Sequence, residues 1–262
     1  MNLHFYKYQG CGNDFIILDN RSKEIKLSTQ QINQLCNRHF GIGADGLMLL
    51  EPEQGYDFKM VYYNSDGNES SMCGNGGRCI TAFAKQLGVI KESTRFMAID
   101  GEHICELKNN EWTLKMQDVK SIQQIDKDTF FLNTGSPHIV KWVDDIDTYP
   151  VYKEGKKIRY DELFKSGNGT NVNFVQLKKD KLVVRTYERG VENETLACGT
   201  GVTAAALIEA LVHHTSHTNF CDVITLGGSL TVTYQKHDDA SFSDIWLKGP
   251  AEFIFEGDFA LS

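Results

Sequence analysis

Two cysteines stand in nearly the same local sequence, about 125 positions apart. The first motif covers 68–76 and contains Cys73, and the second covers 193–201 and contains Cys198. In both motifs Asn, Glu, Cys and two glycines coincide, and an apolar, alanine-containing stretch follows. The duplicated Cys-Gly-x-Gly predicts two thiols that face one another across a pseudo-twofold axis. Such a pair suits removal of a proton from one face of a carbon atom and delivery of a proton to the other face.

Each of these cysteines directly precedes a predicted helix. The unpaired amide N–H groups of a helix's first turn bind anions such as a carboxylate, and they favour thiolate over thiol. The helix dipole lowers a thiol pKa by roughly 0.2–1.5 units, whereas a bound carboxylate acts in the opposite direction. A second negative charge close by is disfavoured, so we expect one thiolate and one thiol. Amide groups of both helix ends would stabilise an enediolate-like intermediate without a cofactor.

The other cysteines are interpreted as packing residues, namely Cys11, Cys36, Cys79, Cys105 and Cys221. Small buried reduced thiols are the usual state of cysteine in a chain of this kind. Zinc has little support, because no Cys-x-x-Cys is present, and we expect no metal. Two alternatives stay open for Cys73 and Cys198: buried inert thiols, and a non-catalytic thiol or zinc-binding module.

Composition narrows the class of protein. The chain has 262 residues, 41% of them hydrophobic and 24% charged, which is ordinary for a globular protein. A net charge of −8 argues against nucleic acid as a partner. No apolar run is long enough to span a bilayer, and the first residues lack the apolar core of a signal peptide. We therefore expect a cytoplasmic protein with neither a membrane nor a nucleic-acid partner.

The repeat divides the chain into two similar halves. Strands are predicted around 3–19, 47–50, 58–63, 96–99, 103–107 and 112–116, then around 130–132, 139–143, 171–177, 182–187 and through 230–255. Helices are predicted over 28–39, from Cys73 to about Leu87, and from Cys198 to about His213. Strands followed by a long helix, twice, predict an α+β fold with a mixed sheet wrapped around a central helix in each half.

The chain resembles the diaminopimelate epimerase family, which are amino-acid epimerases that use no pyridoxal phosphate. The resemblance spans almost the whole chain through motifs in the family's order: 12–15 (GNDF), 41–46 (GIGADG), 64–67 (NSDG), 72–78 (MCGNGGR), 136–138 (SPH), 171–175 (NVNFV) and 188–201 (ERG to CGTG). It implies two pseudo-symmetric halves, 1–118 completed by 252–262, and 119–251, with the active site between them. It also implies a homodimer, no cofactor, and conversion of LL- to meso-diaminopimelate for lysine and peptidoglycan precursors.

The resemblance assigns roles to particular residues. Cys73 and Cys198 become the catalytic acid/base pair. The helix-end groups that hold the reacting carboxylate are Gly74, Asn75, Gly199 and Thr200, and the other substrate-binding positions are Asn13, Asn64, Asn171, Glu188 and Arg189. His138 and Ser136 are supporting residues. An Arg and a Glu suit a carbon that carries both a carboxylate and an ammonium group.

Three departures from the family pattern concern substrate placement. Ser136 stands where family members often have Asn, and this shorter side chain would reach a ligand through water. Gly46 replaces a glutamine of some members. The stretch 190–197 is one residue longer than the common form and lacks its second glycine.

Alternatives stay open at several positions. Glu188-Arg189 could instead form a surface ion pair of little energetic value, and His138 could be a purely structural histidine. Among enzymes, the rival is a racemase of the same fold that acts on proline, hydroxyproline or histidine. Arg189 and Asn171, positioned for a second carboxylate, favour diaminopimelate over it.

Overall fold

The computed structural model describes residues 1–70, 72–167, 169–213 and 219–261. It divides into two compact units: unit 1 comprises Met1–Leu114 and Gly249–Ser262, and unit 2 comprises Lys115–Lys248. Ser71 of the first cysteine motif and Ser262 of the expected segment 252–262 lie outside the described residues. No helix in the described part is long and apolar enough to cross a membrane.

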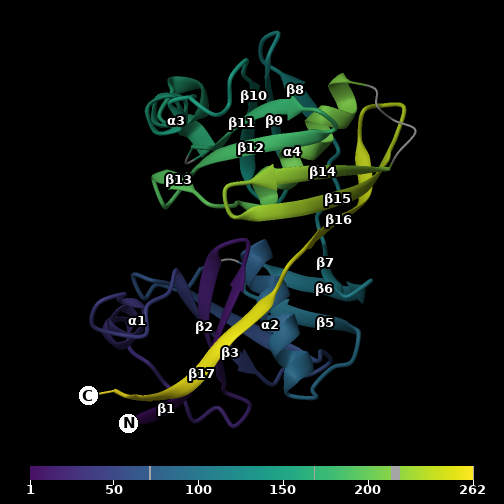
Figure 1. The fold of residues 1–262 in the computed structure, drawn as a ribbon. Helices are drawn as coiled ribbons and strands as arrows, with labels where there is room; N and C mark the ends of the chain where they lie inside the picture. The colour runs from purple at the N-terminus through teal and green to yellow at the C-terminus, as the bar shows by residue number, and fades with distance from the viewer. Residues whose placement is uncertain (71, 168, 214–218, 262) are drawn as a thin grey trace. The chain divides into compact units, whose positions relative to one another are not determined.

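Unit 1 is a mixed sheet with two helices (Figure 1). Its strands are β1 (Asn2–Gly10), β2 (Asn13–Asp19), β3 (Gly46–Glu51), β4 (Phe58–Asn64), β5 (Ser93–Ala98), β6 (Gly101–Lys108), β7 (Glu111–Lys115) and β17 (Glu252–Ala260), and its helices are α1 (Thr29–Cys36) and α2 (Gly74–Gln86). They pair in the order β17, β1, β2, β3, β4, β5, β6, β7, with β2–β3 and β4–β5 parallel. The chain ends join, since the amino group of Met1 donates to the carbonyl of Leu261 at 2.8 Å.

Helix α2 is the central helix of unit 1. Small residues at its start let the strands approach closely: a Cβ on Gly76 would lie 3.3 Å from the sulfur of Met48. From Gly74 to Thr81 the helix is buried, and it contacts β1, β2, β3, β6 and β17. A helix that is buried on nearly every side is a core element rather than a surface element. It ends as predicted, with Gly88 in the left-handed conformation at φ 71°.

Unit 2 repeats this plan (Figure 1). Its strands are β8 (Ile122–Gln124), β9 (Thr129–Asn133), β10 (Pro137–Trp142), β11 (Asn171–Lys178), β12 (Lys181–Glu188), β13 (Asn193–Thr195), β14 (Phe220–Thr225), β15 (Gly228–Lys236) and β16 (Phe242–Gly249), and its helices are α3 (Val151–Arg159), the 3₁₀ helix η1 (Glu162–Gly167) and α4 (Gly199–Val212). The pairing order is β8, β9, β10, β11, β12, β14, β15, β16, with β13 also on β12. Helix α4 is buried from Gly201 to Ala210 and is its central helix.

The two units share one topology. β10–β11 and β12–β14 are parallel in unit 2, as β2–β3 and β4–β5 are in unit 1, and the other equivalent pairs are antiparallel. In both units the central helix follows the fourth strand of this repeated series, after a loop that carries a motif cysteine. The mixed α+β architecture with a central helix in each half is therefore confirmed, and the duplication seen in the cysteine motifs extends to the folding pattern.

Strands β8, β13 and β14 and the 3₁₀ helix η1 are absent from the sequence prediction, and helix α1 differs in length. Helix α1 begins after Ser28, whose side chain and that of Gln31 form a capping box, but it ends at Cys36 rather than at 39. The side-chain oxygen of Asn37 accepts from the amides of His39 and Phe40, and this local turn replaces a further helical turn.

Helix α3 is absent from the prediction. Gly155 lies in its middle, where glycine argues against a helix. A Cβ there would lie 2.4 Å from the Cβ of Tyr187, so the close packing of α3 on β12 requires glycine. Tertiary contact outweighs helix propensity at this position.

Candidate active site

Cys73 occupies the N-cap of α2, with extended backbone angles of φ −98° and ψ 133°. Its side chain makes no capping hydrogen bond, and its carbonyl oxygen accepts from Gly77 N at 2.7 Å. Asn13 comes close from the start of β2, with its Oδ1 3.5 Å from the Cys73 sulfur. The half-buried thiol thus lies at a helix N-terminus whose first amides can donate hydrogen bonds to an anionic group.

The side chain of Asn13 belongs to a charged network. Its Nδ2 donates to Asp45 at 2.6 Å, and Arg38 donates to Asp45 and to Asp14, each at 2.7 Å. Lys7, which is buried, pairs with Asp14 at 2.8 Å. Burial raises the pKa of Asp14, but hydrogen bonds from Arg38 and Lys7 outweigh burial and lower it to about 2. The network fixes Asn13 against Cys73, and its charged members escaped the sequence analysis.

Asn75 is fixed by a second buried cation. The guanidinium of Arg78 donates to Asn75 Oδ1 at 2.7 Å and to the carbonyl of Pro250 at 3.4 Å. Both Asn75 and Arg78 are fully buried. Because its side-chain oxygen faces the guanidinium, the orientation of the Asn75 amide is defined. The contact of Arg78 with Asn75 had no sequence signal beyond the place of both residues in the 72–78 motif.

Asn64 and Gly46 lie opposite one another where β3 and β4 meet. Asn64 is exposed, and its backbone closes the turn to Asn68 and Gly67 at 3.0 and 2.9 Å. A Cβ on Gly46 would lie 2.5 Å from the ring of Tyr62, so no larger residue fits there without movement. The glycine in place of the family's glutamine therefore matches the tyrosine beside it.

Cys198 occupies the equivalent N-cap of α4, at φ −115° and ψ 111°. Its carbonyl oxygen accepts from Val202 N at 2.8 Å, and its sulfur lies 3.5 Å from the hydroxyl oxygen of Thr200. The backbone carbonyl of Thr200 accepts from the Thr134 hydroxyl at 2.9 Å, which fixes the first turn. Gly199 and Cys198 are buried and Thr200 is partly exposed.

Asn171, Ser136 and Arg189 lie together in unit 2. The Asn171 amide donates to the Ser136 hydroxyl at 2.8 Å, and its Oδ1 accepts from Arg189 N at 2.9 Å. The Arg189 guanidinium lies 3.4 Å from the same hydroxyl. All three are predicted from the sequence as substrate-binding or supporting residues, and the fold brings them into direct contact.

Glu188 lies beside these residues on β12, where Thr195 donates to its carboxylate at 2.8 Å. The following turn contains Glu192 in the left-handed conformation, at φ 57°, in the segment that lacks the family's second glycine. Arg159 pairs with Glu192 at 3.1 Å and Tyr160 donates to it at 3.0 Å. These contacts offset the strain of a non-glycine residue in that conformation.

His138 is fully buried on β10 and is neutral. Its Nδ1 lies 3.1 Å from the Asn173 amide nitrogen, so Nδ1 accepts and the proton resides on Nε2. Asn173 also donates to the Ile139 carbonyl at 2.8 Å and accepts from Thr186 at 2.9 Å. Burial, and then the charge of Arg189, lower the pKa of His138 to about 3. Nε2 has no hydrogen-bond partner among the described residues.

Asn173 is a positioning residue that the sequence analysis did not select. It lies two residues after Asn171 on β11, so the strand period could have indicated that both side chains share a face. A Cβ on Gly201 would lie 2.2 Å from Asn173 Oδ1, which places this amide against the first turn of α4.

The remaining cysteines are buried thiols that form no disulfide among the described residues, as predicted. Burial raises the pKa of Cys11 and Cys79, and it raises the pKa of Cys36, Cys105 and Cys221 to about 12. These thiols stay protonated near neutral pH and are poor bases. Within the described ranges, no group of three or more His, Cys, Asp or Glu side chains is arranged to hold a metal ion.

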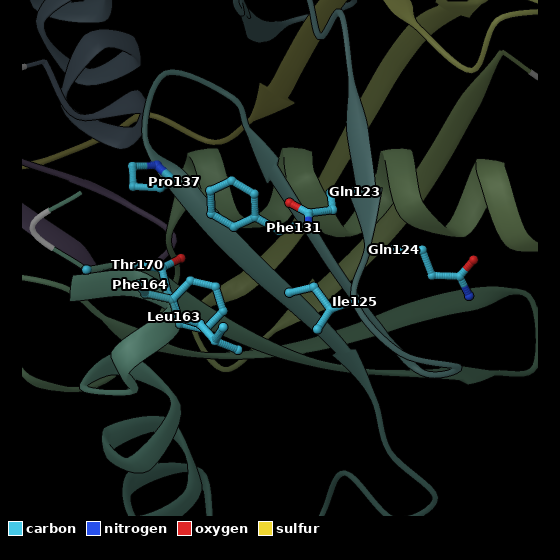
Figure 2. A pocket seen from close by; sticks show the side chains of 9 residues that line it. Gln123, Gln124, Ile125, Phe131, Pro137, Leu163, Phe164 and Thr170 are labelled. Carbon is cyan, nitrogen blue, oxygen red and sulfur yellow. The ribbon is translucent and has the colours of Figure 1, made fainter. Parts of the chain in front are cut away.

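A cavity of about 400 Å³ opens on unit 2, and its lining includes Pro137, whose carbonyl accepts from Asn171 at 3.2 Å. Figure 2 shows the side chains of Phe131, Phe164 and Ile125 gathered around it, and the full lining is Gln123, Gln124, Ile125, Phe131, Pro137, Leu163, Phe164, Gly169 and Thr170. No residue in this lining carries a charge. The cavity therefore does not suit a ligand with carboxylate and ammonium groups.

Each unit carries part of the predicted site. Unit 1 holds Asn13, Asn64, Cys73, Gly74 and Asn75, and unit 2 holds the remainder. Within each unit, the residues around the motif cysteine or the Asn171 amide are in contact as described. That the two sets meet in one cleft stays a prediction.

Comparisons with known proteins find similar proteins over nearly the whole chain. The model of the family described as diaminopimelate epimerase matches residues 5–122 and 130–254. A diaminopimelate epimerase of Flavobacterium psychrophilum is 51% identical over 97% of this chain and 99% of its own length. A diaminopimelate epimerase of Chlorobaculum tepidum is 40% identical over 96% of this chain and 99% of its own. A Bacillus anthracis phenazine biosynthesis protein of the PhzF family has the same fold, with a TM-score of 0.76, 14% identity and 99% of both chains covered.

Proposed function

This chain belongs to the diaminopimelate epimerase family, and we propose that it interconverts LL- and meso-2,6-diaminopimelate. The observation that carries the proposal is the pair of cysteines at equivalent N-caps of the two central helices. Each thiol lies where backbone amides can bind a carboxylate, and the carbon next to that carboxylate is the one that must lose and regain a proton.

The reaction needs one base and one acid on opposite faces of the α-carbon. One thiolate removes the α-proton, and the electron pair spreads into the neighbouring carboxylate. Amides at the starts of α2 and α4, from Gly74 and Asn75 and from Gly199 and Thr200, stabilise the extra charge. The other thiol then protonates the carbon from the opposite face. The configuration inverts. One C–H bond and one S–H bond break while one of each forms, and no group is oxidised or reduced, so this chemistry requires no cofactor.

The second amino-acid centre of the substrate requires its own recognition. Arg189 provides a cation for its carboxylate, and Asn171 and Ser136, which contact Arg189, add hydrogen-bonding groups. Glu188 provides an anion for its ammonium group. Asn13 and Asn64 contribute from unit 1. The position of unit 1 that corresponds to Asn171 is Gly46, so only unit 2 has an amide side chain there. This difference would let the protein distinguish the α-carbon that reacts from the second amino-acid centre, which is only bound.

The test is a comparison of substrates with the purified chain. LL-diaminopimelate should yield the meso isomer, and the meso isomer should yield LL, as measured by chiral chromatography. Proline, 4-hydroxyproline and histidine should react far more slowly, because they leave Arg189 without a carboxylate partner. Faster racemisation of any of these three would replace the proposal with the racemase alternative. Stoichiometric zinc bound through Cys73 and Cys198 in freshly purified protein would replace it with the metal-binding alternative.

The proposal extends to the setting of the enzyme. We place the reaction in the supply of lysine and of peptidoglycan precursors. The seven cysteines of the described residues form no disulfide, which fits a reducing compartment such as the cytoplasm.

A homodimer is proposed through β17, the edge strand of unit 1. Phe253, Ile254 and Phe255 on this strand are about half exposed, an apolar patch on a strand that can pair further. Sedimentation equilibrium should give twice the mass of the chain, and Ile254→Asp should shift the protein toward the monomer. A wild-type monomer at micromolar concentration would contradict it.

A further inference from the structure

Asn13 lies between a carboxylate and a thiol. Its Nδ2 is 2.6 Å from Asp45 Oδ2, and its Oδ1 is 3.5 Å from the Cys73 sulfur. A carboxylate can only accept hydrogen bonds, so the NH₂ group of Asn13 must face Asp45. The amide carbonyl therefore faces Cys73. A carbonyl can only accept, so this contact is a hydrogen bond only while Cys73 carries its proton.

Asp45 cannot easily release Asn13. Arg38 donates to Asp45 and to Asp14, and the amide of Asp14 lies 3.4 Å from the same Asp45 oxygen that binds Asn13. Lys7 fixes Asp14 from the buried side. The carboxylate of Asp45 is thus held by neighbours on two elements, and with it the orientation of the Asn13 amide.

We infer that Asp45 is a positioning residue that acts through Asn13, keeping Cys73 in the protonated thiol form in the unliganded protein. The inference rests on the proposed function in one respect, namely that Cys73 is one of the two reacting thiols. A hydrogen bond to the neutral form of an acid opposes its ionisation, and here it works against the helix dipole. Cys73 is then the acid of the resting pair, which settles an assignment that the near-symmetry of the two motifs hides.

Other titratable groups of unit 1 lie around Asn13 and Cys73. Besides Lys7, Asp14, Arg38 and Asp45, they are Arg78 on α2, Asp100 in the β5–β6 turn and His103 on β6, whose ring contacts Asp100. Burial raises the pKa of the neighbouring Cys79, and the charge of Arg78 only partly opposes it. Asp100 accepts from Met72 N at 3.3 Å, one residue before Cys73. Every variant below keeps these groups and the whole of unit 2 unchanged except for the named side chain. Differences between variants therefore report on the Asn13 amide and on Asp45.

The experiment is peptide-resolved alkylation of the full chain by iodoacetamide, without substrate, from pH 5 to pH 10. The rate at Cys73 rises with the thiolate fraction, so its midpoint measures ionisation independently of access. Asn13→Ala removes the acceptor and should lower the Cys73 midpoint by about half a unit to one unit. Asp45→Asn frees the amide to turn its NH₂ toward the sulfur and should lower the midpoint at least as far.

The double variant separates positioning from direct charge. If Asp45 acts through Asn13, then Asn13→Ala with Asp45→Asn should have the midpoint of Asn13→Ala alone. If the negative charge of Asp45 acts directly on the sulfur, the two shifts should add, and the positioning role is overturned. An unchanged or higher Cys73 midpoint in Asn13→Ala overturns the inference even if Asp45→Asn fails to fold.

Matched controls are Asn2→Ala on β1 and Asp19→Asn, which removes a partly exposed carboxylate paired with Arg21. Neither should move the Cys73 midpoint. The measurement needs no turnover, so its outcome is independent of the substrate test. Absence of epimerase activity in the wild type would refute the proposed function. An unshifted Cys73 midpoint in Asn13→Ala, with an active wild type, would refute only this inference.

Discussion

Replacing Asp14 with Asn should destabilise unit 1, because it leaves a buried lysine without its counter-charge. Lys7 has a side chain that is 7% exposed and lies 2.8 Å from the Asp14 carboxylate. Arg38 donates two hydrogen bonds to the same carboxylate, at 2.7 and 3.0 Å. Removal of one partner of a buried ion pair is costly because the remaining charge is uncompensated.

The magnitude follows from the pKa of Asp14. Burial raises this pKa, but the bonds from Arg38 and Lys7 lower it from 3.8 to about 2. At about 1.36 kcal/mol per unit, the ionised form contributes about 2 kcal/mol to the free energy of unfolding. The folded pKa is lower than the unfolded pKa, so this contribution is fully present above about pH 4 and is lost as pH falls toward 2.

The assay is equilibrium denaturation of wild type and Asp14→Asn in urea at pH 7 and pH 3. The variant should lose about 2 kcal/mol at pH 7 and about half of that at pH 3, where part of the wild-type advantage has gone. Asp19→Asn, which breaks the exposed pair with Arg21, should lose no more than about 1 kcal/mol. An Asp14→Asn penalty that is equal at both pH values, or no larger than the Asp19→Asn penalty, would refute the reasoning.

Three further outcomes are expected. Alanine at Cys73 or Cys198 should abolish epimerisation, and serine should leave activity lower by at least about 10²-fold, since a hydroxyl is a far weaker base; chiral chromatography measures both. Gly201→Ala should lower the melting temperature and the rate, because its Cβ would lie 2.2 Å from Asn173 Oδ1 and displace that amide. His138 should make the unfolding free energy fall by about 2 kcal/mol from pH 7 to pH 5. Its pKa is about 3 in the folded protein and 6.5 in the unfolded chain, so only the unfolded state gains the proton in this range.

Each of these has a matched control. Cys36→Ala removes a buried thiol outside both motifs and should leave the rate near that of wild type. Gly257→Ala meets only ordinary contacts, 3.4 Å from Phe5, and should change the melting temperature little. His138→Gln should remove most of the pH 7 to pH 5 slope. Wild-type rates in both cysteine variants, an unchanged melting temperature in Gly201→Ala, or an unchanged slope in His138→Gln would each contradict the corresponding argument.

The features that sequence predicted best are those with a local signal. The Cys-Gly-x-Gly motifs mark helix starts, and α2 and α4 begin directly after Cys73 and Cys198. Glycine and other small residues permit the N-cap geometry, and they also let the strands approach the helix. Alternating apolar residues located most strands, and the repeated motif led to the repeated topology.

The features that sequence missed depend on contacts between distant segments. Helix α3 contains Gly155, and only its packing on Tyr187 explains a glycine there. Asp45 lies in the 41–46 motif and Arg38 in none, and the motif does not show the role of either; that role arises because β2 and the turn before β3 bring them to Asn13. Asn173 is recognised as a positioning residue only by its hydrogen bond to His138 on the neighbouring strand β10. Such networks form only once the strands are in register, so the strand period could place Asn173 on the face of Asn171 but could not show its hydrogen bonds.

The most direct test of the account is hydrogen exchange at carbon in deuterated water. With purified, fully reduced protein and no added cofactor, LL-diaminopimelate should gain deuterium at an α-carbon as the meso isomer forms, measured by mass spectrometry and NMR. The exchange should disappear in both Cys73→Ala and Cys198→Ala. Inversion without deuterium incorporation, or exchange that persists when both cysteines are replaced, would contradict proton transfer by the paired thiols.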